Sequence, residues 1–280
     1  MVNAIKAVYG WIDNLIQSLA GEGSNLTTSL DEYSEEISDF VDSIIENVTL
    51  PVAYTILALF FVMELYKLSL KTESMGASSL GAENVFKVLF KVVICKTVLE
   101  STPKILKNIY AATVHIIQGA KGALAEVKLP VKPDALSPID EILSALERSF
   151  WGDLIFLLLL FIGYLIVVIA VAIASVMIIG RFIEIYIYLA VAPIPLATLI
   201  SDEQSQIGKN FIKSFAAVCI QGFLIYLVLT FFPLLFMSLT TATSLHRASA
   251  MGIQFIGFGL ILIMALFNTN KWAKSICNAM

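Results

Sequence analysis

Residues 154–179 (LIFLLLLFIGYLIVVIAVAIASVMII) form a run of 26 positions without a single charged side chain. A helix of that length extends about 39 Å, which exceeds the roughly 30 Å of hydrocarbon in a bilayer. A helix on the surface of a soluble domain would carry a polar face within such a run. Residues 214–245 and 248–267 are also free of charge. The sequence therefore predicts an all-α polytopic membrane protein with about five to seven spans.

The composition supports this class, and the distribution of charge predicts an orientation. The chain of 280 residues is 58% apolar and 14% charged, whereas soluble domains are about half apolar and about a quarter charged. Ten acidic side chains and no Lys or Arg lie between Lys6 and Lys67. Under the positive-inside rule, this acidic segment belongs outside the membrane. The C-terminal end, with Lys271 and Lys274, belongs in the cytoplasm.

Residues 1–49 are predicted to form an extracytoplasmic hairpin of two amphipathic helices. Apolar side chains recur at helical spacing over 2–19 and again over 30–48, with a glycine-containing turn between them. Ser29 and Glu32 fit a capping box at the start of the second helix. Two interpretations remain open: the hairpin rests on the membrane or on itself, or it is a surface for an extracytoplasmic partner.

Residues 50–71 are predicted as the first transmembrane span, and Pro51 suits its first turn. Glu64 lies near the end of this span, three residues before Lys67. Side chains at this spacing are neighbours on a helix, so we expect an ion pair between them.

Residues 72–150 are predicted as amphipathic helices and a linker rich in Lys and Pro, mostly cytoplasmic. Over residues 83–118, five lysines and Glu100 interrupt the apolar pattern, and a span facing only lipid would not carry them. We expect helices over about 83–100 and 103–120, with Pro103 starting the second. This region crosses the membrane twice or not at all in our interpretation.

Residues 151–280 are predicted as a C-terminal transmembrane bundle. Its spans are expected at 154–179, 182–200, 211–239 and 251–268.

The stretch 181-RFIEIYIYLAVAPIPLA-197 combines a charge pair with two prolines inside this bundle. Arg181 and Glu184 can pair across one helical turn, and we expect them where the span 154–179 ends. Pro193 and Pro195 each remove a backbone donor and crowd the preceding turn, so they break the helix. We interpret these four residues as a structural joint and subunit contact.

Ionisable side chains inside a membrane are also functional candidates. An alternative function therefore remains open: a secondary transporter or small ion channel that uses Glu64, Arg181 and Glu184. Lys209 and Lys213 lie one turn apart where a helix would enter the membrane. They either anchor to lipid headgroups or dock an acidic cytoplasmic partner.

The chain carries no recognisable pattern of catalytic or metal-binding residues. Its two histidines, His115 and His246, lie far apart and outside any zinc-protease motif. Gly208-Lys209 lacks the earlier glycine of a phosphate-binding loop, and the three cysteines show no metal spacing. We therefore expect no enzyme activity, no catalytic residue, no cofactor and no metal.

Residues 180–230 bear a family resemblance. The string GRFIEIYIYLAVAPIPLA, a short polar loop and GKNFIKSFAAVCIQGFLIYL together resemble the TrbL-like polytopic inner-membrane subunit of conjugative type IV secretion systems. The shared pattern is an Arg-led span ending in Ala-Pro-x-x-x-Ala, then a Gly-Lys-x-Phe helix entry followed by Gln-Gly. The matching residues are Arg181, Ala192, Pro193, Ala197, Gly208, Lys209, Phe211, Gln221 and Gly222.

The resemblance implies a non-enzymatic subunit of the bacterial cytoplasmic membrane at the channel base of a conjugation machine encoded by a mobile element. It implies contact with the lipid bilayer, extracytoplasmic channel components and cytoplasmic ATPases, and transient contact with translocating DNA. It also implies a homo-oligomeric ring, with a pentamer among the options. Within the shared pattern we assign Gln221 and Gly222 to helix–helix packing.

Overall fold

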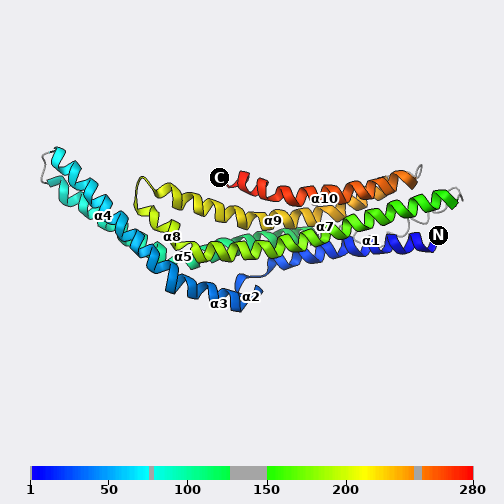
Figure 1. The fold of residues 1–280 in the computed structure, drawn as a ribbon, viewed down its shortest axis with the longest axis horizontal. Coiled ribbons are helices and arrows are strands. Elements are labelled where there is room, and N and C mark those ends of the chain that lie inside the picture. The colour runs from blue at the N-terminus through cyan, green and yellow to red at the C-terminus, as the bar shows by residue number, and fades with distance from the viewer. Residues whose placement is uncertain (1, 76–78, 127–149, 243–247, 280) are drawn as a thin grey trace. The chain divides into compact units, whose positions relative to one another are not determined.

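The computed structural model describes residues 2–75, 79–126, 150–242 and 248–279, which are helical with short connections and contain no β-strand. The order of elements is α1 (Val2–Glu22), the 3-10 helix η1 (Gly23–Thr27), α2 (Leu30–Tyr33), α3 (Glu35–Ile44), the π-helix η2 (Ile45–Thr49), α4 (Leu50–Met75), α5 (Ser79–Glu126), α7 (Phe150–Val191), α8 (Pro193–Leu196), the 3-10 helix η3 (Ala197–Ile200), α9 (Ser205–Ala242) and α10 (Ala248–Ile276) (Figure 1). Part of the predicted linker, residues 127–149, lies outside the described residues.

Four helical stretches are long and apolar enough to cross a membrane, by length and composition: Glu35–Leu70, Leu154–Val191, Ser205–Leu235 and Ile253–Ile276. The prediction of an all-α polytopic membrane protein is confirmed. These stretches account for the expected spans with one exception, which concerns the region around Arg181.

The prediction of separate spans at 154–179 and 182–200 is wrong, because α7 continues from Phe150 to Val191 as one helix. Gly180 costs a helix only about 1 kcal/mol, which is too little to end so apolar a segment. The pair formed by Arg181 and Glu184 spans one turn and therefore fits a continuing helix. The break comes instead at Ala192, just before Pro193, which cannot donate a backbone hydrogen bond.

The prediction of two helices divided at Pro103 is also wrong. Pro103 lies inside α5, which is continuous from Ser79 to Glu126. The missing N–H of Pro103 leaves the carbonyl of Leu99 without its helical donor. Leu99 and Leu106 are nevertheless almost fully buried on either side of the proline. Burial of this apolar face keeps the helix intact, because tertiary packing supplies most helical stability in proteins.

The chain divides into two compact units. Unit 1 comprises Met1–Thr28, Val114–Gly180 and Gln221–Trp272, and unit 2 comprises Ser29–Thr113, Arg181–Ile220 and Ala273–Met280. The division falls within α5, α7, α9 and α10. Each unit therefore gathers segments that lie far apart in the sequence.

Close approach of α7 and α10 characterises unit 1. A Cβ added at Gly259 would lie 2.5 Å from Cγ2 of Ile166, and one added at Gly163 would lie 3.1 Å from Cβ of Phe255. Gly257, two residues before Gly259, has no neighbour within 4 Å of such a Cβ. The tight contact therefore depends on Gly259, and Gly257 makes no comparable contact.

Replacing Gly259 with Ala should destabilise the protein, and replacing Gly257 with Ala should not. Ile166 is branched at Cβ and cannot move aside freely, so overpacking should cost about 1–3 kcal/mol, less about 1 kcal/mol gained in helix propensity. The measurement is the melting temperature of each purified variant in the same detergent. Equal melting temperatures for the two variants would contradict the close approach of the helices.

Candidate functional site

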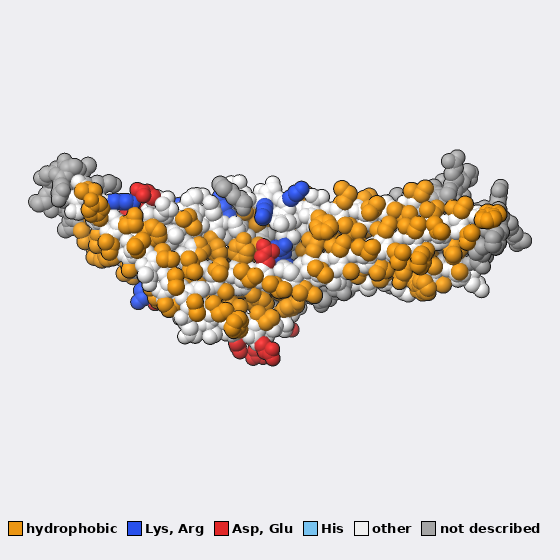
Figure 2. Space-filling view, viewed as in Figure 1, with side chains coloured by type: hydrophobic (Ala, Val, Ile, Leu, Met, Phe, Trp, Pro, Cys, Tyr) orange, Lys and Arg blue, Asp and Glu red, His pale blue; other side chains and the backbone are white. Residues whose placement is uncertain are grey.

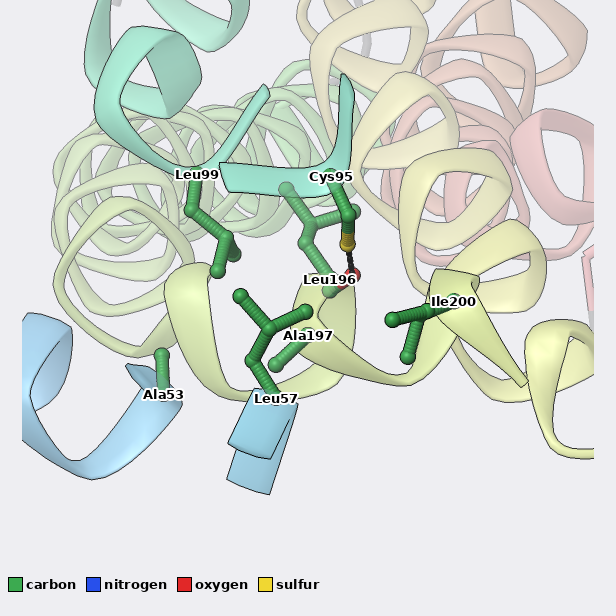
Figure 3. Close-up of a cluster of buried hydrophobic side chains, with 7 residues drawn as sticks. All are labelled: Ala53, Leu57, Cys95, Leu99, Leu196, Ala197 and Ile200. Atoms are coloured by element: carbon green, nitrogen blue, oxygen red, sulfur yellow. Dashed lines mark hydrogen bonds between the residues drawn. The ribbon is translucent and has the colours of Figure 1, made fainter. Parts of the chain in front are cut away.

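The residues that directly follow the Pro-x-Pro segment belong to a buried cluster in unit 2. Side chains from α8 and η3 fit between α4 and α5, and each member of the cluster is at most 6% exposed (Figure 3). The thiol of Cys95 faces the carbonyl oxygen of Leu196 at 3.8 Å. The cluster consists of Ala53 and Leu57 from α4, Cys95 and Leu99 from α5, and Leu196, Ala197 and Ile200.

Hydrogen bonds support the backbone of this segment where it leaves the regular helix. The amide of Leu196 donates to the carbonyl of Ala192 at 3.3 Å, and the hydroxyl of Thr198 donates to the carbonyl of Pro195 at 2.8 Å. The first turn of α9 then packs on the segment at Gly208. A Cβ there would lie 2.8 Å from Leu199 and 3.0 Å from the oxygen of Pro195.

Ion pairs hold the loop that follows η3 against both neighbouring helices. Nζ of Lys67 in α4 lies 2.9 Å from Glu203, and Nζ of Lys91 in α5 lies 2.7 Å from Asp202. Lys67 also contacts Glu64 at 3.5 Å, so the pair expected from their spacing is present. Solvent screening leaves each of these exposed pairs weak by itself. Together they fix the loop to α4 and α5.

Lys107 of α5 joins the acidic N-terminal helices. Its Nζ lies 3.1 Å from Asp31 and 3.0 Å from Asp42, and it donates to Oγ of Ser38 at 3.3 Å. Ser38 in turn donates to Asp31 at 2.6 Å. The bond from Ser38, with help from Lys107, holds the pKa of Asp31 below its usual value. Figure 2 shows other acidic side chains gathered at the edge formed by α2 and α3.

Aromatic contacts fix α2 against α7 within unit 2. The ring of Tyr33 stacks on Phe182 with centroids 3.7 Å apart and planes 7° apart. The hydroxyl of Tyr186 donates to the carbonyl of Leu30 at 2.6 Å. Tyr110 of α5 approaches Phe182 edge-on at 6.3 Å. These contacts are not predictable from the sequence, in which only the place of Tyr33 in an apolar stripe indicates burial.

The charge pair of α7 is present, in the interior of the helix. Arg181 donates from Nη1 to Glu184 at 2.8 Å; Arg181 is buried and the side chain of Glu184 is 44% exposed. Nε of Arg181 has no partner in the part of the chain that the structure describes. The expected place of this pair, at the end of a span, is therefore corrected. Its role in a subunit contact stays a prediction.

The other predicted residues lie in separate surroundings. Lys209 is exposed and Lys213 half-buried on α9, and no ion pair is found for either among the described residues. Gln221 donates from Nε2 to Oγ1 of Thr269 at 3.2 Å, which joins α9 to α10 inside unit 1. A Cβ at Gly222 would lie 3.8 Å from Leu26, an ordinary contact. The alternative transport residues Glu64 and Glu184 each pair with a different cation.

A family model described as "TrbL/VirB6 plasmid conjugal transfer like protein" matches residues 15–193. The matched range runs from α1 through the acidic helices, α4, α5 and α7 to the first proline of the joint. No curated protein and no solved structure matches the chain significantly.

Replacing Gly208 with Ala should weaken the contact between α9 and the Pro-x-Pro segment. The new methyl group would meet the backbone oxygen of Pro195, which cannot rotate away, so we expect a loss of about 1–3 kcal/mol. Gly180→Ala is the control, because a Cβ at that position has no neighbour within 4 Å. Chemical unfolding in mixed detergent measures both; a Gly208→Ala variant as stable as its control would contradict this packing.

The acidic cluster around Lys107 should stabilise the protein only while Asp31 is ionised. Because the pKa of Asp31 is lowered in the folded state, this contribution is complete well above the pKa of the unfolded carboxyl and is lost as the pH falls through the lowered folded-state pKa. Asp31 is largely exposed, so Asp31→Asn should cost at most about 1 kcal/mol at pH 7, and progressively less as the pH falls through that lowered pKa. In a Lys107→Met background the cost at pH 7 should shrink. A cost independent of both pH and Lys107 would contradict the assigned interaction.

Proposed function

The chain belongs to the TrbL/VirB6 plasmid conjugal transfer-like family, and from that membership we propose that it is a channel-base or scaffold subunit of a conjugative, type IV-like machine for DNA and protein secretion. Membership makes it a component of a conjugative transfer system, in contact with other secretion-system subunits. With its four apolar helices, it is a multi-pass protein of the inner membrane. The observation that carries the proposal is the family match over residues 15–193.

The use of charge in unit 2 supports a structural role. The ionisable side chains around the Pro-x-Pro segment pair with one another across three elements, as Lys67 with Glu203 and Lys91 with Asp202 do. Such pairs position chain segments, and neither brings a nucleophile to a base. We therefore propose a non-enzymatic subunit that adjoins the cytoplasmic ATPases and the extracytoplasmic channel components and makes transient contact with DNA.

We further propose that copies of the chain form a ring, with the N-terminus outside and the C-terminus in the cytoplasm. The ion pair between Lys67 and Glu203 supports one part of this topology, because it places the end of α4 and the loop before α9 on the same side of unit 2. Arg181 and Glu184 would contribute to a contact between copies. Lys209 and Lys213 would face cytoplasmic partners or headgroups.

Deletion of the gene in a donor strain should abolish conjugative transfer, and the intact gene supplied in trans should restore it. The Pro193→Ala, Pro195→Ala double variant should restore little transfer, because a continued helix would remove the break that seats α8 and η3 between α4 and α5. Transfer frequency and co-purification of the secretion subunits measure the effect. Pro51→Ala is the control, since Pro51 lies exposed in the first turn of α4.

Normal transfer from the deletion strain would overturn the proposed function. Normal transfer and co-purification with the double variant would overturn only the joint role of the two prolines.

A further inference from the structure

Two polar levels bound the packing of α4 against α5 in unit 2. At one level, Lys67 and Lys91 bind the loop before α9. At the other level, Lys107 binds Asp42 and Asp31. Lys91 and Lys107 are sixteen residues apart, which corresponds to about 24 Å of helix. The part of α4 between these levels belongs to a stretch apolar enough to cross a membrane.

Helix α5 runs alongside α4 through this layer in the opposite direction. Ala53 and Leu57 of α4 share one buried cluster with Leu99 and Cys95 of α5 (Figure 3). The hydroxyl of Tyr54 donates to Oε1 of Glu100 at 3.2 Å, which fixes the same register. The layer that α4 crosses is therefore crossed by α5 as well. The charged side chains of α5 explain why this helix is not among the four stretches apolar enough to cross a membrane.

The exposed faces of the two helices differ within this layer. The exposed side chains of α4 are almost all apolar, as a helix facing lipid requires; the large ones are Val52, Leu59, Val62, Met63 and Tyr66. Between positions 96 and 104, α5 instead exposes Lys96, Thr97, Glu100 and Lys104. Lys96 and Glu100 lie 3.6 Å apart, with side chains 61% and 51% exposed.

Lipid cannot cover this charged face cheaply. Ionisable side chains within a membrane face a protein interior or water, because hydrocarbon does not solvate them. A lysine can extend its charge toward the interface, but Glu100 has a short side chain. It lies about 13 Å along the helix from Lys91 and about 10 Å from Lys107. Neither polar level can therefore solvate its carboxylate.

We propose that the polar face of α5, defined by Lys96, Thr97, Glu100 and Lys104, lines a hydrated passage across the membrane. The inference rests on the proposed function, since a channel-base subunit is one that borders such a passage. Two lysines against one glutamate give the face a net positive charge. A charged wall attracts solutes of the opposite sign, so the passage favours anionic over cationic solutes.

Single cysteines test the proposal with the full chain in native membranes. The background protein lacks the native thiols (Cys95→Ala, Cys219→Ala, Cys277→Ser). Each single-cysteine variant must first elute from a size-exclusion column at the same volume as the unmodified protein. Thr97→Cys lies on the polar face of α5, and Leu59→Cys is its matched control on the exposed face of α4. The probes are two membrane-impermeant methanethiosulfonates, one with a sulfonate and one with a trimethylammonium group.

Thr97→Cys should react with both probes, severalfold faster with the sulfonate, and Leu59→Cys should react with neither. Lys104→Cys provides a second test position if Thr97→Cys fails to fold. Reaction at neither helix would mean that lipid or another protein covers the face, and this would overturn the proposal. Reaction at both helices would place the whole layer in water, with the same consequence. Faster reaction with the cationic probe would overturn the assigned preference.

These results are distinguishable from a failure of the proposed function. If deletion of the gene abolishes transfer and Thr97→Cys is unreactive, the proposed function is supported and the proposed passage is contradicted. If the deletion strain transfers normally, while Thr97→Cys reacts and Leu59→Cys does not, the proposed function is contradicted. The polar face of α5 is then still hydrated, in a protein with a different role.

Discussion

The structure of unit 2 depends on one constraint: a buried backbone that leaves the regular helix must find other partners for its polar groups. Pro193 and Pro195 interrupt the regular pattern of donors between α7 and α9. The chain meets the constraint by placing α8 and η3 between α4 and α5, where Leu196, Ala197 and Ile200 are almost fully buried. The absence of a side chain at Gly208 lets α9 close over the segment.

The distribution of charge follows from that enclosure. Once α8 and η3 lie between α4 and α5, the loop after η3 comes within reach of Lys67 and Lys91, and its two acids pair with them. At the other level, Lys107 gathers acids from α2 and α3. These pairs stabilise little individually, but each joins elements distant in sequence. Lys96 and Glu100 differ because they pair within one helix and remain half exposed.

Sequence reasoning predicted what local spacing determines. The capping of α2 by Ser29 and the pairs Glu64–Lys67 and Arg181–Glu184 follow from residues three positions apart, and all are present. It erred where tertiary packing overrides a local signal: a proline did not divide α5, and a buried arginine did not end α7. It could not find Tyr33 on Phe182 or Lys107 on Asp42, because these contacts depend on which helices become neighbours.

The two errors about helices have opposite effects on the predicted topology. Replacing the predicted spans 154–179 and 182–200 by the single helix α7 removes one crossing and leaves four. The single crossing by α5 that we propose brings the number back to five. The sum over α4, α5, α7, α9 and α10 stays odd, so the proposed placement of the termini on opposite sides survives. Lys67, Lys209 and Lys274 then still fall on the cytoplasmic side, whereas Lys121, in the region predicted as mostly cytoplasmic, falls outside. The charged face of α5, which argued against a crossing, becomes in this topology a membrane-crossing surface that lipid does not suit.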